Sequence, residues 1–161
     1  MFEKDLSKMI ETITAVATTA ITSGSLLIAT VNLDKAELCL PSKECFPVLI
    51  GKDTPKGKFN INIYKTSKSG YGGEVLGFHQ SGKDLFAIHR VWLGNPKEKR
   101  DIRIKSSNIS DRLITNGCIN ISEEGYLKVR NMLTLEVQVT LMSKPKMPSS
   151  PYLINIANKY I

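Results

Sequence analysis

Residues 58–64 alternate apolar and polar side chains, which is the period-two pattern of a half-buried β-strand. Other short runs of strand-forming residues, bounded by turn-forming ones, recur through the chain at residues 26–33, 37–40, 45–51, 85–91 and 133–141, and around residue 76. Residues 123–131 instead have the pattern of a helix. The sequence therefore predicts a mainly β domain with peripheral helices.

The turn-forming residues, prolines and glycines between these runs predict how the strands are connected. A turn-like cluster separates residues 26–33 from 37–40 and favours a hairpin, and Pro47 should place its own run at a sheet edge or a strand start. Residues 67–73 are glycine-rich and predict a flexible loop. Residues 94–116 form a longer polar stretch between two predicted elements, and such loops are usually functional.

The length of 161 residues and the 42% hydrophobic content suit one core and one domain. We expect an amphipathic helix in residues 1–24, a main domain in residues 25–143, and a proline-containing tail in residues 144–161 that closes with a short helix. The N-terminus lacks the net positive flank of a signal peptide, and Thr and Ser residues interrupt the apolar stretch that follows. The sequence predicts no integral membrane segment.

The formal net charge of +7 favours anionic partners. The lysines are scattered, and the densest charged cluster, residues 97–101, mixes both signs. A nucleic-acid site would instead need a basic patch with interleaved aromatic residues. We therefore expect no nucleic-acid partner; the charge suits a polyanionic cell wall, or it only keeps the surface solvated.

The three cysteines fall into a pair and a remainder. Cys39 and Cys45 flank a predicted hairpin loop, so a disulfide between them is possible. The alternative is two buried thiols in a reducing cell, and the compartment decides between these. Cys118 is left over as a candidate reactive thiol.

Cys118 follows Gly117, and the pair has features that a nucleophilic cysteine requires. A glycine before the nucleophile lets a substrate carbonyl approach the main chain, where backbone amides can stabilise an oxyanion. His89, at the end of the predicted strand 85–91, is the candidate base that would generate the thiolate. Taken alone, each residue is more often a buried core residue.

The residues around Cys118 resemble the active-site motif of the L,D-transpeptidases, which are cysteine enzymes that cross-link peptidoglycan. The matching residues are His89, Thr115, Gly117, Cys118, Ile119 and Asn120. A second stretch, from Phe46 to Phe59, is similar to another signature of that family and contains Gly51, Thr54, Pro55 and Gly57. We expect these last residues to form a tight turn. The resemblance spans roughly residues 26–141 and implies a β-sandwich-like core.

Two features depart from the family pattern. Asn116 occupies the place of a second histidine, which leaves His89 as the sole base. The wide spacing between His89 and Cys118 implies an extended active-site loop, and we predict that residues 94–116 form a mobile lid over the cysteine.

The resemblance also implies roles for particular residues. The catalytic set comprises Cys118, His89, the backbone amides of Asn116, Gly117 and Cys118, and the carbonyl of Arg90, which would orient the imidazole. The substrate-binding candidates are Arg103, Arg112, Ser106, Thr115 and Asn120. Asn95, Arg100 and Asp111 resemble further polar positions of the loop. For Arg112 we favour an internal salt bridge with Asp111 over a substrate carboxylate, and for Asn120 a hydrogen bond that holds the turn.

The resemblance implies a cysteine acyltransferase that acts on peptidoglycan stem peptides in the periplasm or elsewhere in the cell envelope. No cofactor is expected, and no ligand spacing predicts a metal site. His79 lies in no motif and receives no role. Attack by water in place of an amine would make the protein an L,D-carboxypeptidase or endopeptidase, and a delivered antibacterial effector would use the same chemistry. The alternative of another class is a non-catalytic, basic wall-binding module in which Cys118 is inert.

Overall fold

The computed structural model describes residues 26–142 and 152–157. The fold is mainly β, as predicted, with few helices at its periphery. The strands are β1 (Leu26–Asn32), β2 (Glu37–Cys39), β3 (Cys45–Leu49), β4 (Gly57–Asn60), β5 (Asn62–Lys65), β6 (Glu74–Ser81), β7 (Asp84–Arg90), β8 (Ile119–Ile121) and β9 (Tyr152–Ala157). The helices are η1 (Pro96–Glu98), α1 (Arg100–Arg103), η2 (Ile109–Arg112) and α2 (Glu123–Met142). The helix predicted in residues 1–24 lies outside the described residues.

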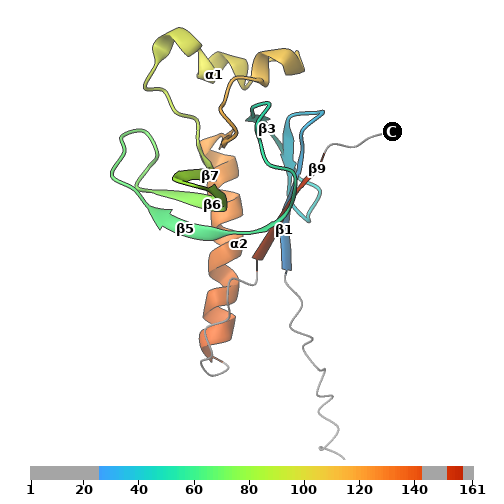
Figure 1. The fold of residues 1–161 in the computed structure, drawn as a ribbon. Helices are drawn as coiled ribbons and strands as arrows, with labels where there is room; N and C mark the ends of the chain where they lie inside the picture. Colours follow the sequence, from blue (N-terminus) through green and yellow to red (C-terminus); the bar gives the residue numbers. More distant parts are fainter. Residues whose placement is uncertain (1–25, 143–151, 158–161) are drawn as a thin grey trace, which may run out of the picture.

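The strands form one sheet in the order β4-β9-β1-β2-β3-β8-β7-β6-β5. β4 and β5 stand at opposite ends of this order, yet only Ile61 separates them along the chain. The sheet therefore curls until its two outer strands meet at this residue (Figure 1). The single strand predicted for residues 58–64 is thus two strands, with the Ile61 side chain buried at the bend.

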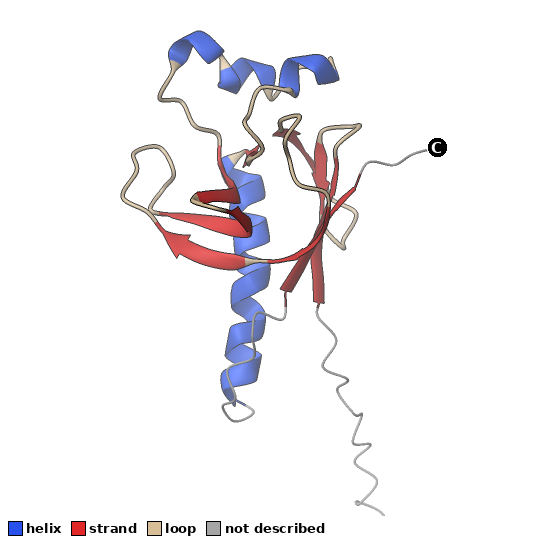
Figure 2. Cartoon of the chain, in the orientation of Figure 1, coloured by secondary structure: helices blue, strands red, loops and turns tan. Residues whose placement is uncertain are grey.

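The core lies between the curled sheet and one face of α2, which runs along the sheet (Figure 2). The strands contribute mostly branched aliphatic side chains, and α2 adds Tyr126, Val129 and Leu133. Full burial of one such aliphatic side chain contributes roughly 1.5–3 kcal/mol to folding. Fully buried members of this core are Ile28, Val31, Leu38, Val48, Leu76, Ile88, Ile119, Ile121 and Ile154.

The strand predicted for residues 133–141 is wrong, because these residues belong to α2. The helix begins after Ser122, whose hydroxyl accepts a hydrogen bond from the Gly125 amide at 3.2 Å. No proline lies between Glu123 and Pro145, so the helix predicted for residues 123–131 continues through this segment. The alternating apolar residues of this segment were compatible with a strand. Strand propensity depends strongly on context, however, and here the segment continues the helix that starts at Glu123.

The short helix predicted to close the tail is also wrong within the described residues. Residues 152–157 form β9, which pairs parallel to β1 and antiparallel to β4. Tyr152, Ile154 and Ile156 are buried on alternate positions. Residues 144–151 and 158–161 lie outside the described residues.

The other predicted strands are present in the structure, but the position expected for Pro47 is not. β1 and β2 form the expected antiparallel hairpin, and residues 67–73 form a loop. Pro47 lies on β3, which is inside the sheet rather than at its edge. Pro47 pairs with Glu37 of β2, whereas pairing with β8 begins only at Val48, so the proline has a strand neighbour on one side only.

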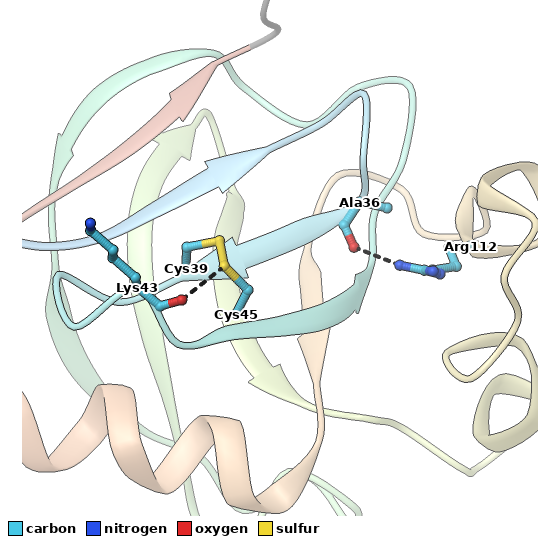
Figure 3. The surroundings of a disulfide bond; sticks show 5 residues. All are labelled: Ala36, Cys39, Lys43, Cys45 and Arg112. Atoms are coloured by element: carbon cyan, nitrogen blue, oxygen red, sulfur yellow. Dashed lines mark hydrogen bonds between the residues drawn. A yellow bond between two sulfur atoms is a disulfide. The ribbon is translucent and has the colours of Figure 1, made fainter.

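Cys39 and Cys45 form a disulfide, which confirms the pairing considered from the sequence (Figure 3). The two residues are direct partners across β2 and β3, with their Cα atoms 4.0 Å apart. Cys118 is the free cysteine. Among the helices that the structure describes, none is long and apolar enough to cross a membrane.

Candidate active site

The sheet brings His89 and Cys118 onto neighbouring strands. β7 and β8 are adjacent and parallel, and their register places His89 beside Asn120. Alternate residues of a strand share a face, so Cys118, which immediately precedes β8, lies on the same face as Asn120 and His89. The pairing of β7 with β8 thus brings together two candidate residues that are far apart in sequence. Their separation in sequence arises because parallel strands need a long connection, here residues 91–118.

The imidazole of His89 is buried and held at both nitrogens. Its Nδ1 lies 2.7 Å from the carbonyl oxygen of Arg90, which is the contact predicted from the sequence. Because a carbonyl only accepts, Nδ1 carries the proton, and Nε2 accepts a hydrogen bond from Nδ2 of Asn120 at 3.2 Å. Burial lowers the pKa of His89 to about 4, so the ring is neutral at neutral pH.

The thiol of Cys118 lies against the backbone of β7. Its Sγ is 3.8 Å from the carbonyl oxygen of Leu85, which lies four residues before His89 on the same strand. Burial raises the pKa of the thiol, and the Ala87 backbone with the positive charges of Arg100 and Lys68 acts in the opposite direction. The pair is therefore a neutral thiol beside a neutral imidazole.

Asn120 links His89 to Arg100 of α1. The Asn120 side chain is fully buried, and its Oδ1 accepts a hydrogen bond from Nη1 of Arg100 at 2.8 Å. Arg100 is in turn paired with Glu98 at 2.5 Å. Because Arg100 occupies the amide oxygen, the amide nitrogen of Asn120 must face His89. Asn120 was expected to hold the turn by a hydrogen bond, but its side chain forms hydrogen bonds with Arg100 and His89. Its substrate-binding role stays a prediction.

Thr115 organises the turn that precedes Cys118. Its hydroxyl donates to the carbonyl of Cys118 at 2.6 Å and accepts from the amide of Gly117 at 3.2 Å. Gly117 has φ of +114°, a conformation that favours glycine. The Gly117 amide, one of the predicted oxyanion donors, is thus engaged within the turn, while the Asn116 side chain is exposed.

Residues 51–54 pack against the backbone of this turn. A Cβ atom at Gly51 would lie 1.9 Å from the carbonyl oxygen of Thr115 and 2.8 Å from the amide nitrogen of Gly117. The Thr54 hydroxyl accepts from the Gly51 amide at 3.0 Å, and the Thr54 amide donates to the Gly51 carbonyl at 3.1 Å, which closes the predicted tight turn. The two sequence motifs are therefore in direct contact.

Residues 94–116 contain η1, α1 and η2 and lie at one end of the sheet (Figure 1). Arg103 donates to the backbone carbonyls of Glu98 at 2.9 Å and Asp111 at 3.1 Å. The Ser106 hydroxyl donates to the Asp111 carboxylate at 2.6 Å. These side chains hold the segment together, and its mobility stays a prediction.

Arg112 does not form the expected salt bridge with Asp111. Its guanidinium donates instead to the carbonyl of Ser106 at 2.9 Å. It also donates to the carbonyl of Ala36 at 3.1 Å (Figure 3). It therefore fastens the segment to the turn between β1 and β2. In the described part of the chain, no hydrogen bond joins Arg103, Ser106 or Arg112 to Cys118 or His89, and a substrate-binding role for them stays a prediction.

The loop between β5 and β6 supplies Tyr71, which the sequence reasoning missed. The Tyr71 ring contacts the imidazole of His89 edge-on, with 4.5 Å between centroids. Burial raises the pKa of Tyr71, and the nearby Cys118 acts in the same direction. Arg90 holds this loop by donating to the Tyr71 carbonyl at 3.2 Å, and it also pairs with Glu123 at 2.6 Å. An aromatic residue between glycines was the only sequence signal.

Glu37, Cys39 and Cys45 are the described residues whose side-chain atoms cluster closely enough to hold a metal ion. Both cysteines are bridged to each other, so neither offers a thiolate. No protein-family model matches the chain, and no curated protein matches it either.

Proposed function

We propose that the protein is an L,D-transpeptidase-like cysteine acyltransferase that acts on peptidoglycan stem peptides. The observation that carries this proposal is the placement of Cys118 and His89 on one face of adjacent parallel strands. The Arg90 carbonyl fixes the proton on Nδ1 and leaves Nε2 as the basic nitrogen. The proposed substrate, a peptidoglycan stem peptide, follows from the resemblance of the sequence motifs around both residues to those of the L,D-transpeptidases.

The reaction begins when the Cys118 thiol transfers its proton to Nε2 of His89. The thiolate attacks the carbonyl carbon that follows the third stem residue, and a tetrahedral oxyanion forms. Collapse breaks the peptide bond, and the imidazolium protonates the amine of the departing D-residue. The amine of an acceptor stem then attacks the thioester, gives its proton to His89, and releases the Cys118 thiolate.

Proton transfer needs a rearrangement of the contacts seen here. Rotation of Cys118 about its Cα–Cβ bond would move Sγ from Leu85 toward the His89 side of the strand. The Asn120 amide would then release Nε2. The positive charges of Arg100 and Lys68 favour the thiolate, and movement of the Thr115 hydroxyl would free the Gly117 amide for the oxyanion.

The disulfide supports an exported location. Cys39 and Cys45 are bridged, and such bridges persist mainly in oxidising compartments such as the periplasm. An enzyme acting on stem peptides would work in that compartment, whether it belongs to the cell itself or is delivered as an effector.

Intact-mass analysis after incubation with a stem tetrapeptide or a carbapenem tests this proposal. We expect the wild-type protein to gain the mass of the acyl group or the drug, and Cys118→Ala to gain nothing. An unmodified wild-type protein under all conditions would contradict the proposal. Analysis of the products by mass separates attack by an amine from attack by water, and so distinguishes a transpeptidase from a carboxypeptidase.

One observation favours a non-catalytic wall-binding module as a second candidate. Cys118 is directed at the Leu85 carbonyl, and its pKa is raised by burial, as expected of an inert thiol. The rate of alkylation by iodoacetamide at neutral pH discriminates between the two. A thiol activated by His89 reacts faster in the wild type than in His89→Ala, whereas an inert thiol reacts equally slowly in both.

A further inference from the structure

A cleft of about 620 Å³ is lined in part by Tyr71, whose ring contacts His89. One wall comes from residues 68–71 in the loop between β5 and β6, and the other from residues 92–94 after β7. Tyr71 belongs to this lining and also contacts the His89 ring. Tyr71 therefore connects the cleft to the histidine, and the volume of the cleft falls within the usual range for small-molecule sites.

Lys68 is the charged residue among those that line the cleft. Its side chain is exposed, and within the described ranges it forms no ion pair. Three glutamates of the neighbouring segments are already paired: Glu74 with Lys65 and Arg130, Glu98 with Arg100, and Glu123 with Arg90. The charge of Lys68 is therefore available to a ligand.

The electrostatic effect of Lys68 reaches the nucleophile. Burial raises the pKa of Cys118, and the charges of Arg100 and Lys68 oppose that rise. The guanidinium of Arg100 lies 5.4 Å from the ring of Trp92, behind the second wall of the cleft. Arg100 is itself paired with Glu98, so among the described residues Lys68 is the unpaired positive charge at the cleft, and an anionic group placed there would lie near the reacting sulfur.

We propose that this cleft binds the free C-terminal carboxylate of the donor peptide through Lys68, with Tyr71 and Trp92 flanking the departing residue. A single ammonium on a flexible stem suits a carboxylate, since it provides a compact charge without the arginine fork that binds phosphate bidentately. This inference rests on the proposed acyl-transfer function, because the carboxylate belongs to the residue that leaves when Cys118 is acylated.

The test compares two synthetic donor tetrapeptides, one ending in a free carboxylate and the other in a carboxamide. The rate of Cys118 acylation is followed by intact mass for the wild type, Lys68→Ala and Lys68→Arg. Lys83→Ala is the matched control, because Lys83 is an exposed lysine in the turn between β6 and β7. We expect the wild type and Lys83→Ala to prefer the carboxylate peptide by about tenfold, which corresponds to about 1.4 kcal/mol.

Lys68→Ala should lose this preference through a KM raised for the carboxylate peptide alone. Loss of the Lys68 charge near Cys118 should slow acylation by both peptides to the same extent, so the ratio of the two rates reports the carboxylate contact. Lys68→Arg should retain most of the preference. Acylation of Lys68→Ala with the preference intact would overturn this inference alone. Absence of acylation of the wild type by either peptide would overturn the acyl-transfer function as well, so the two failures are distinguishable.

Discussion

The amide nitrogen of Asn120 lies 3.2 Å from Nε2 of His89, at the nitrogen that would accept the proton of Cys118. Arg100 holds the other end of the same amide at 2.8 Å. A residue of α1 therefore determines, through Asn120, how the histidine of β7 is presented. Any displacement of α1 that withdraws Arg100 also weakens the constraint on the imidazole.

Asn120→Ala should destabilise the protein. The substitution leaves Nε2 of His89 and Nη1 of Arg100 without their partner, and a buried unsatisfied polar group costs about 1–3 kcal/mol. Urea denaturation of the wild type and the variant measures the difference. Asn116→Ala is the control, because the exposed Asn116 side chain should change stability by less than about 0.5 kcal/mol.

The stability of the fold should fall between pH 6.5 and pH 4. Burial lowers the pKa of His89 to about 4, whereas in the unfolded chain it has its ordinary value of about 6.5. The unfolded state therefore binds a proton in this window that the folded state does not, and the loss amounts to roughly 3 kcal/mol at its lower end. Urea denaturation between pH 6.5 and pH 4 measures this change in the free energy of unfolding. In His89→Asn the contribution of this histidine to the pH dependence should be absent.

Asn120→Asp tests the origin of that shift. It places a carboxylate beside the imidazole, which favours the protonated ring and should raise the pKa of His89 above 4. The chain has only two histidines, so NMR titration can follow each separately. A pKa of His89 that is unchanged in this variant would show that burial outweighs the new charge.

Gly51→Ala should disrupt the turn that carries Cys118. The added Cβ would lie 1.9 Å from the Thr115 carbonyl oxygen, and because this atom is backbone, the whole turn must move. We expect a loss of several kcal/mol in stability together with loss of acylation. Gly82→Ala, where nothing lies within 4 Å, should cost only the roughly 1 kcal/mol of its positive φ.

Reduction of the disulfide should have a modest effect. The bridge closes a short loop, with a sequence separation of 6, and chain entropy assigns such a loop about 2 kcal/mol. The comparison is between the wild type and the double variant Cys39→Ser, Cys45→Ser in urea. Alkylation of the denatured, unreduced protein should label one thiol, and three labels would show that the bridge is absent.

The strands were predictable where alternation, turn residues and glycines agreed, as in β1, β2, β6 and β7. The pattern failed at residues 133–141, because alternating apolar residues also fit a helix that continues from Glu123 without a breaker. It also failed at Ile61, where the bend depends on the closure of the sheet between β4 and β5. Such closure is a property of the whole sheet and has no local signal.

Within the candidate site, His89, Cys118 and the Arg90 carbonyl came from motifs and strand ends. The link from Arg100 through Asn120 to His89 did not, because it joins a loop helix to a strand over a long sequence separation. The partners of Arg112 were missed for the same reason, since backbone carbonyls carry no residue signature. Side-chain roles set by tertiary contacts are therefore the part that the sequence could not give.

Cys118→Ala and His89→Ala should both abolish rapid acylation, but for different reasons. Cys118→Ala removes the sulfur that forms the thioester, so no acyl-enzyme should form at any pH. His89→Ala leaves a thiol whose pKa burial raises above the ordinary value of about 8.5, so slow acylation should persist and increase toward alkaline pH.

In the wild type, by contrast, acylation should already be effective near neutrality, because His89, with a pKa of about 4, is unprotonated and ready to accept a proton. The acylation rate should fall only as the pH approaches 4. For an exposed histidine, with an ordinary pKa of about 6.5, the rate would already fall at that higher pH. Intact mass against time, from pH 4 to pH 10, measures all three proteins, and circular dichroism confirms that each variant is folded. Acylation of His89→Ala at the wild-type rate would show that His89 is not the base. The thiolate would then depend on the positive charges of Arg100 and Lys68 alone.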